Sequence, residues 1–118
     1  MKRLAVAFAL AMLAGCGQSA LQTAKLAGLA SKQTAEAAYL TVRVEYLEGR
    51  VDEQTMQKAR DLYARYALAQ QAYHDAIVLW ESGAAQEDPA VLRAQVGALA
   101  AALEALASNV KWQMANSR

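Results

Sequence analysis

Residues 59–80 read ARDLYARYALAQQAYHDAIVLW, and the spacing of their apolar side chains is that of a helix. These side chains recur at alternating intervals of three and four residues, at Ala59, Leu62, Tyr66, Ala69, Tyr73, Ala76 and Trp80. Such spacing places all seven on one face, as in the seam of a coiled coil. It predicts a helix from about Glu53 to Ser82 that packs against a neighbour through this face.

Two further segments on either side have the composition of helices, because they are rich in alanine and poor in glycine. They run from about Ser19 to Glu48 and from about Pro89 to Lys111. The last segment has a seam of its own, formed by Leu92, Val96, Leu99, Leu103, Leu106 and Val110. The first segment has two apolar stripes, Ala35, Tyr39, Val42 and Tyr46 in one and Leu40, Val44 and Leu47 in the other. Two stripes favour a helix that contacts two partners.

The segments between these helices contain residues that end and begin helices. Gly49 and Gly83 can adopt the left-handed conformation that ends a helix. Asp52 can cap the second helix, and Asp88 can cap the third, with Pro89 at its first position. Connections this short make neighbouring helices antiparallel. We therefore predict an all-α fold, an antiparallel up-down-up three-helix bundle with coiled-coil-like seams, formed by residues 21–118.

The N-terminal segment does not fit this bundle. Met1, Lys2 and Arg3 form a basic head, and an uncharged apolar run of eleven residues follows from Leu4 to Ala14. A helix that spans a membrane needs about 20 apolar residues, so this run is too short to cross one. Its length and its basic flank are typical of a secretion signal that is removed from the mature protein.

The end of this segment, Leu13-Ala14-Gly15-Cys16, resembles the lipobox of bacterial lipoproteins at all four positions. The resemblance implies cleavage between Gly15 and Cys16 and a diacylglyceryl thioether on the Cys16 sulfur. Residues 1–15 would then be the signal peptide and residues 16–20 a lipidated tether. An ordinary signal peptide with an unrelated cysteine is the alternative, although Cys16 is the only cysteine in the chain.

The net charge of the mature chain and the residue after Cys16 indicate which partners and which membrane to expect. Loss of Lys2 and Arg3 leaves ten basic side chains of the original twelve against eleven acidic ones, a sum of about −1. This balance favours neither nucleic acid nor an anionic lipid surface. Gly17 follows the lipidated cysteine, whereas enterobacterial lipoproteins that stay in the inner membrane carry Asp there. We therefore expect residence in the outer membrane, facing the periplasm.

The residues that could perform catalysis or bind a metal are few. His74 is the only histidine, and the side chains beside it on a helix, Gln70, Gln71, Ile77 and Val78, are not usual metal ligands. A di-iron bundle motif would need Glu at position 71. The chain also lacks Cys-x-x-Cys-His, Gly-x-Ser-x-Gly and phosphate-loop motifs. We expect no catalytic residue, no metal site, no cofactor and no small-molecule substrate.

The tyrosines allow two interpretations. Tyr39 and Tyr46 lie seven residues apart in the first helix, and Tyr66 and Tyr73 lie seven apart in the second. Such rows can line a ligand groove. At helical spacing they are more often part of the core, with their hydroxyls at the water edge, and this is the interpretation we prefer.

These features favour a non-enzymatic envelope lipoprotein with a structural or protein-interaction role. It would present a helical surface to another protein or self-associate through its helices. A small phage- or plasmid-type lipoprotein acting in lysis or exclusion is the alternative, by analogy alone. The up-down-up order would bring Arg50 and Trp112 to the end far from the lipid, where they could bind a partner. Alternatively, Trp112 could fold onto Val44 and Met56 as part of the core.

Overall fold

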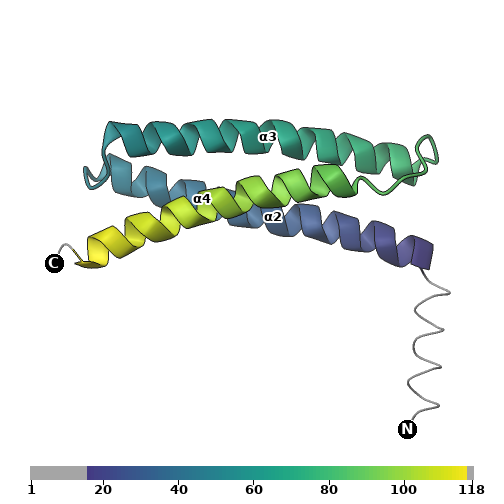
Figure 1. Ribbon diagram of the computed structural model, residues 1–118, viewed down its shortest axis with the longest axis horizontal. Coiled ribbons are helices and arrows are strands. Elements are labelled where there is room, and N and C mark those ends of the chain that lie inside the picture. The colour runs from purple at the N-terminus through teal and green to yellow at the C-terminus, as the bar shows by residue number, and fades with distance from the viewer. Residues whose placement is uncertain (1–15, 117–118) are drawn as a thin grey trace, which may run out of the picture.

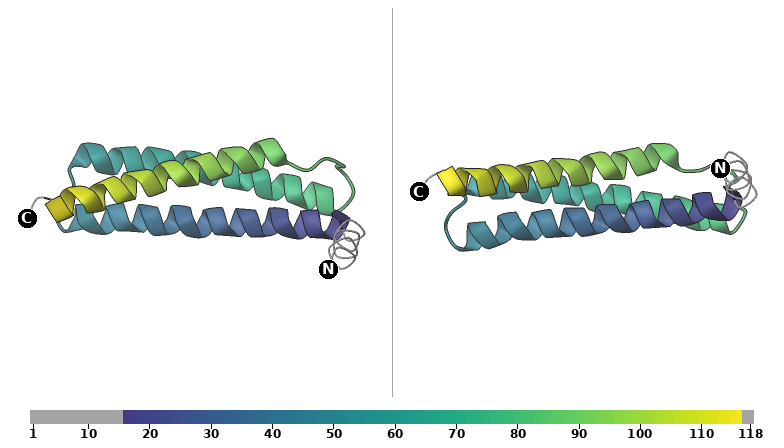
Figure 2. Two further views of the ribbon diagram at one scale, coloured as in Figure 1. Left: turned by 60° about the horizontal axis from the view of Figure 1, so that its bottom comes forward. Right: turned by 90° about the horizontal axis from the view of Figure 1, so that it is seen from below.

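The computed structural model describes residues 16–116, with side chains from residue 20 onward. Residues 16–116 form three helices, α2 (Cys16–Leu47), α3 (Glu53–Glu81) and α4 (Ala90–Asn116), each packed against the other two. The chain reverses direction at each connection, as Figure 1 shows, and the side views in Figure 2 show the same three rods. The predicted all-α three-helix bundle is confirmed. The predicted signal peptide, with Gly15 at its cleavage site, lies outside the described residues.

The connection between α2 and α3 is formed by the residues predicted to end one helix and begin the next. Gly49 has a φ of 77°, its N–H donates to the Tyr46 carbonyl oxygen at 3.0 Å, and the Arg50 N–H donates to the Glu45 carbonyl oxygen at 2.9 Å. These two bonds satisfy carbonyl groups that the end of α2 would leave exposed. Asp52 caps α3, because its Oδ1 accepts from the backbone N–H of Thr55 at 2.7 Å.

Two helix ends differ from prediction. The first is at α2, which begins at Cys16 and so includes residues 16–20, predicted to be a tether. The second is at α4, which continues five residues past the predicted end at Lys111, to Asn116. No glycine or proline interrupts this extension, and the side chain of Asn116 donates to the Trp112 carbonyl oxygen at 2.8 Å. Sequence spacing locates such ends only to within a few residues.

The start of α4 also differs in detail. The carboxylate of Asp88, predicted to cap backbone amides, accepts two hydrogen bonds from the guanidinium of Arg93, at 2.7 and 3.1 Å. This hydrogen bonding raises the pKa of Arg93. The second connection otherwise matches the prediction, with Gly83 at a φ of 82° just after α3.

The core is formed by the predicted seams of α3 and α4. Every seam position on these two helices is buried or half-buried. The side of α2 that faces them is made of smaller residues, which are Ala24, Gly28, Ala35, Ala38 and Val42. A Cβ atom added to Gly28 would lie 3.0 Å from Cε1 of Tyr73. The small residues of α2 therefore give the large side chains of α3 room to enter the core.

The second apolar stripe of α2 does not enter the core, so this part of the prediction is wrong. Leu40 is 57% exposed, Val44 40% and Leu47 70%. The helix does contact both α3 and α4, as predicted, but through its single small-residue face. Periodicity identifies two stripes, whereas the packing of the neighbouring helices decides which of them is covered.

Tyr66 and Tyr73 lie in the core, and Tyr39 and Tyr46 are half-buried against it, which confirms the core part of the preferred interpretation. The rings of Tyr66 and Tyr73 are buried, and the ring of Tyr39 stacks on that of Tyr63 with centroids 4.5 Å apart. The hydroxyls of Tyr66 and Tyr73 do not reach the water edge. The Tyr73 hydroxyl donates to the Ala24 carbonyl oxygen at 2.6 Å, whereas the buried Tyr66 hydroxyl has no hydrogen-bond partner within residues 16–116.

This contrast predicts opposite effects of the same substitution. Tyr73→Phe removes a buried hydrogen bond and should lower the free energy of unfolding by about 1–2 kcal/mol. Tyr66→Phe removes an unsatisfied buried hydroxyl and should raise it by about 1 kcal/mol, or about 4–8 °C in melting temperature. Thermal unfolding of the two variants beside the parent measures both effects. Equal destabilisation by both would contradict the described core.

Stability at high pH provides a second prediction. Burial, with smaller contributions from Glu36 and Tyr63, raises the pKa of Tyr66 from its ordinary value of 10.0 to about 12. Since the folded state favours the protonated hydroxyl, this contribution to stability is present below pH 10 and is lost as the pH rises toward 12. The urea midpoint of the parent should therefore fall more steeply over this range than that of Tyr66→Phe, and parallel curves would refute the assignment.

Candidate interaction surfaces

The described residues offer no centre for metal binding. Within residues 16–116, no group of three or more His, Cys, Asp or Glu side chains could hold a metal ion. His74 is exposed on α3, beside a groove between α2 and α3 that Lys25 and Lys32 also line. Lys25 pairs with Glu81 across this groove at 2.7 Å. The rim of the groove therefore carries an ion pair and the exposed Lys32, at the end of the bundle where α2 begins.

The acidic cluster around the first turn has structural roles. Arg50 pairs with Glu45 at 3.0 Å and with Glu48 at 2.6 Å. Glu53 accepts from the Tyr46 hydroxyl at 2.7 Å, and this hydrogen bond is the main reason that the pKa of Tyr46 is raised. These contacts hold the end of α2 against the start of α3.

The predicted partner-binding residues lie at one end of the bundle. The turn between α2 and α3, which carries Arg50, and the end of α4, which carries Trp112, both lie opposite the start of α2 (Figures 1 and 2). Trp112 is 65% exposed, so the alternative in which it packs into the core is wrong. Arg50 uses its guanidinium within its own turn. Trp112 is therefore the stronger candidate for a partner contact.

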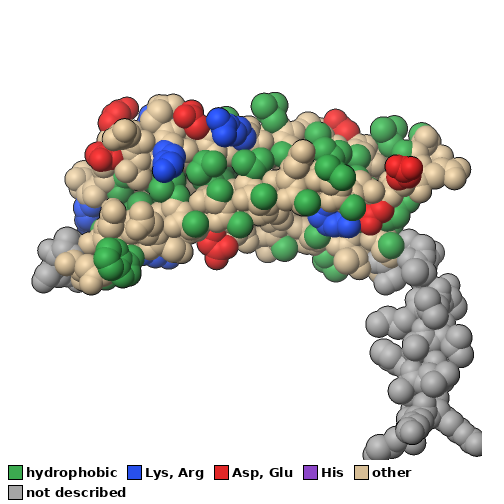
Figure 3. Space-filling view, viewed as in Figure 1, with side chains coloured by type: hydrophobic (Ala, Val, Ile, Leu, Met, Phe, Trp, Pro, Cys, Tyr) green, Lys and Arg blue, Asp and Glu red, His purple; other side chains and the backbone are tan. Residues whose placement is uncertain are grey.

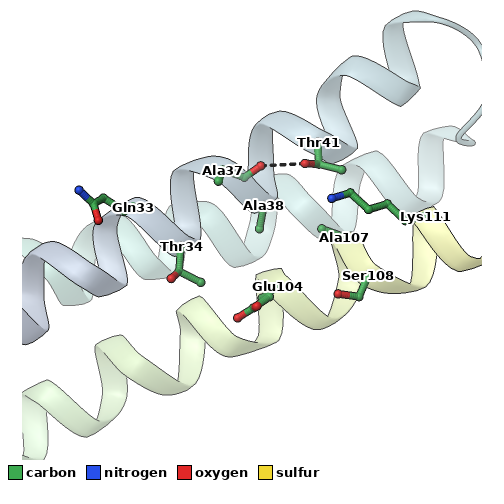
Figure 4. Close-up of a pocket in the computed structure, with 9 residues that line it drawn as sticks. All are labelled: Gln33, Thr34, Ala37, Ala38, Thr41, Glu104, Ala107, Ser108 and Lys111. Atoms are coloured by element: carbon green, nitrogen blue, oxygen red, sulfur yellow. Dashed lines mark hydrogen bonds between the residues drawn. The ribbon is translucent and has the colours of Figure 1, made fainter.

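A shallow groove of about 400 Å³ between α2 and α4 was not predicted. Thr34 of α2 and Glu104 of α4 face each other across it in Figure 4. The hydroxyl of Thr41 is already used, because it donates to the Ala37 carbonyl oxygen at 2.9 Å. The groove is open to solvent and suits the side chains of a partner better than a small molecule, since ligand sites are mostly enclosed and apolar. The sequence indicates this groove only through Ala38 and Ala107, two small residues that line it from α2 and α4.

Apolar side chains also reach the surface along the helices, as the green atoms in Figure 3 show for one face. Besides Trp112, the exposed large ones on α3 and α4 are Leu68, Val78, Leu79 and Val91. Within residues 16–116, α4 has the length and apolar composition that a membrane span would need. Its seam packs against α2 and α3, and exposed alanines make up much of its other side.

The chain matches no protein-family model, no curated protein and no solved structure. The lipobox-like segment and the surfaces described above are therefore the basis for assigning a function.

The exposure of Trp112 predicts the outcome of its removal. Trp112→Ala should change the free energy of unfolding by less than about 1 kcal/mol, as for a surface position. Met56→Ala, at a fully buried residue of α3, should cost about 2–5 kcal/mol. Thermal unfolding of the two variants compares them directly, and a large melting shift for Trp112→Ala would place this side chain in the core.

Proposed function

We propose that this protein is an envelope lipoprotein, held on the periplasmic face of the outer membrane by lipid on Cys16. Its role would be non-enzymatic, the binding of another protein through the bundle. The observation that carries the proposal is the match of Leu13-Ala14-Gly15-Cys16 to all four lipobox positions, the last of which is the first residue of α2. Gly17, in place of the Asp that retains enterobacterial lipoproteins in the inner membrane, supports the outer membrane.

The length of α2 would then determine how far the bundle extends from the membrane surface. Because α2 begins at Cys16, little flexible chain would separate the lipid from the bundle. The 32 residues of α2 extend about 48 Å at 1.5 Å per residue. The headgroups would crowd the end where α2 begins, and the opposite end would be open to the periplasm. That end carries Trp112, an exposed aromatic side chain of the kind enriched in binding hot spots.

The surface chemistry favours binding over catalysis. The charged side chains near the first turn form ion pairs and a helix cap, and the grooves are shallow and open. Large apolar side chains are exposed on all three helices. Exposed apolar side chains that gather into patches are typical of surfaces that bind other proteins.

The lipid anchor can be tested by removing its attachment site. The Cys16→Ser variant should leave the membrane fraction, because two or three acyl chains hold a protein firmly at about 0.8 kcal/mol per buried CH₂. For the parent, density-gradient separation should place the protein with the outer membrane. Retention of Cys16→Ser in the membrane after its signal peptide has been removed would refute the anchor, and a pure inner-membrane band for the parent would refute the sorting.

The distal contact can be tested by crosslinking in intact cells. Trp112→Ala should reduce the yield of the crosslinked partner while the amount and melting temperature of the protein stay unchanged. Leu68→Ala, at an exposed leucine on α3, is the matched control and should leave the yield unchanged. An equal loss with both variants, or no loss with Trp112→Ala, would contradict a binding role for this end.

A further inference from the structure

The outer side of α2 carries a second seam, which the core does not use. Its positions alternate at intervals of four and three residues, and all are exposed: Leu26, Ala30, Gln33, Ala37, Leu40, Val44 and Leu47. We call these seven residues the outer seam. It lies on the opposite side of α2 from the buried Ala35 and Val42. It contains no charged residue, whereas the outer side of a bundle helix is ordinarily charged and polar.

No described part of the chain covers the outer seam. Both α3 and α4 pack on the inner face of α2. Gln33 and Ala37 of the seam line the open groove beside α4 but remain exposed, and the four large side chains of the seam are between 40% and 70% exposed. The row spans 22 residues, or about 33 Å of helix, which corresponds to three heptads. An exposed row of this length that is apolar at every position except Gln33 is typical of an association surface.

The composition of the outer seam fits a second α2 helix. Its leucines recur every seven residues at Leu26, Leu40 and Leu47, with Gln33 in the remaining place. The other seam positions, which alternate with these, are Ala30, Ala37 and Val44. The two alanines are small enough to allow two helices to approach closely. Val44 is the one β-branched residue at these alternate positions, and valine there beside leucine in the other set is the combination that favours two parallel strands. A single polar layer such as Gln33 fixes the register of the pair, because the two amides can bond to each other.

The flanking charges are complementary in a parallel pair. In a parallel coiled coil, the residue just before one layer faces the partner residue five positions later in the sequence. Arg43 then faces Glu48 of the partner subunit, and Glu36 faces Thr41 of the partner subunit, so no like charges meet. Arg43 forms no ion pair within residues 16–116. Glu48 binds Arg50 through Oε2, and a carboxylate can accept from a second guanidinium.

We propose that two copies of this chain pair in parallel through the outer seam of α2. The parallel orientation rests on the proposed function, because two copies anchored through Cys16 in one membrane have their α2 helices starting at the same surface. The pairing would cover the exposed leucines of α2 and leave Trp112 at the distal end free for a partner.

Disulfide crosslinking in the full-length, membrane-bound protein tests this pairing. Val44→Cys and Ala30→Cys, each introduced alone, should form a disulfide-linked species of twice the chain mass when membranes are oxidised. The matched control is Leu68→Cys on α3, outside the seam, which should remain a single chain. An antiparallel pair would instead link Ala30→Cys to Val44→Cys when the two variants are expressed together, and neither to itself.

A charge in the seam provides a second measurement. Leu40→Glu added to Val44→Cys should reduce the linked species at least about tenfold, because the apolar layer would have to bury a carboxylate. Leu68→Glu, the same change outside the seam, should leave it intact. No linked species at twice the mass, an adduct of a different mass, a hetero-linked antiparallel pair, or equal linking through Leu68→Cys would each overturn the proposal.

The same experiment separates failure of the pairing from failure of the anchor. If the Cys16 sulfur is a thioether, the parent chain has no free thiol and forms no disulfide. A disulfide in the parent would therefore refute the anchor. The pairing would then be judged in a Cys16→Ser background, where Val44→Cys is the only thiol and linking at twice the mass would still support the outer seam.

Discussion

Close contact between Tyr73 of α3 and the small residues of α2 sets the spacing of these two helices. The ring of Tyr73 lies where a side chain on Gly28 would stand, and its hydroxyl donates to the backbone of Ala24 at 2.6 Å. A buried hydroxyl needs a partner, so the ring can lie this deep only because the α2 backbone supplies one. The alanines of α2 extend the same close approach along the helix, and the leucines and valines of α4 fill the remaining side of the core.

The same arrangement explains why α2 has two apolar faces. Its inner face is small because large side chains from α3 and α4 fill the core. Of the leucines of α2, only Leu21 packs against that core, and the others remain exposed, which are Leu26, Leu29, Leu40 and Leu47. A helix with small residues inside and leucines outside is suited to a bundle that associates further. Association would bury the exposed leucines, and removal of their apolar surface from water is favourable.

Lipidation and helical packing would act together in the proposed function. If the single cysteine carries lipid, as proposed, no disulfide is left to stabilise the chain outside the cytoplasm, and the three-helix core would do so by packing alone. An anchor at the first residue of α2 would orient the bundle and hold copies in the same direction. It would also turn the end that carries Trp112 away from the membrane.

Local sequence patterns were sufficient to predict the three helices, though not all of their ends, the seams of α3 and α4, and the first connection, whereas in the second connection the predicted cap at Asp88 was wrong. Gly49, Gly83 and Asp52 act within a few residues of their own position, so their effects can be derived without knowledge of the fold. The same patterns could not show which stripe of α2 is covered, that Trp112 is exposed, or that the Tyr66 hydroxyl is buried without a partner. Periodicity defines the faces of one helix relative to each other. Which face is buried depends on side chains from other helices, far away in the sequence, and only their packing in three dimensions brings them together.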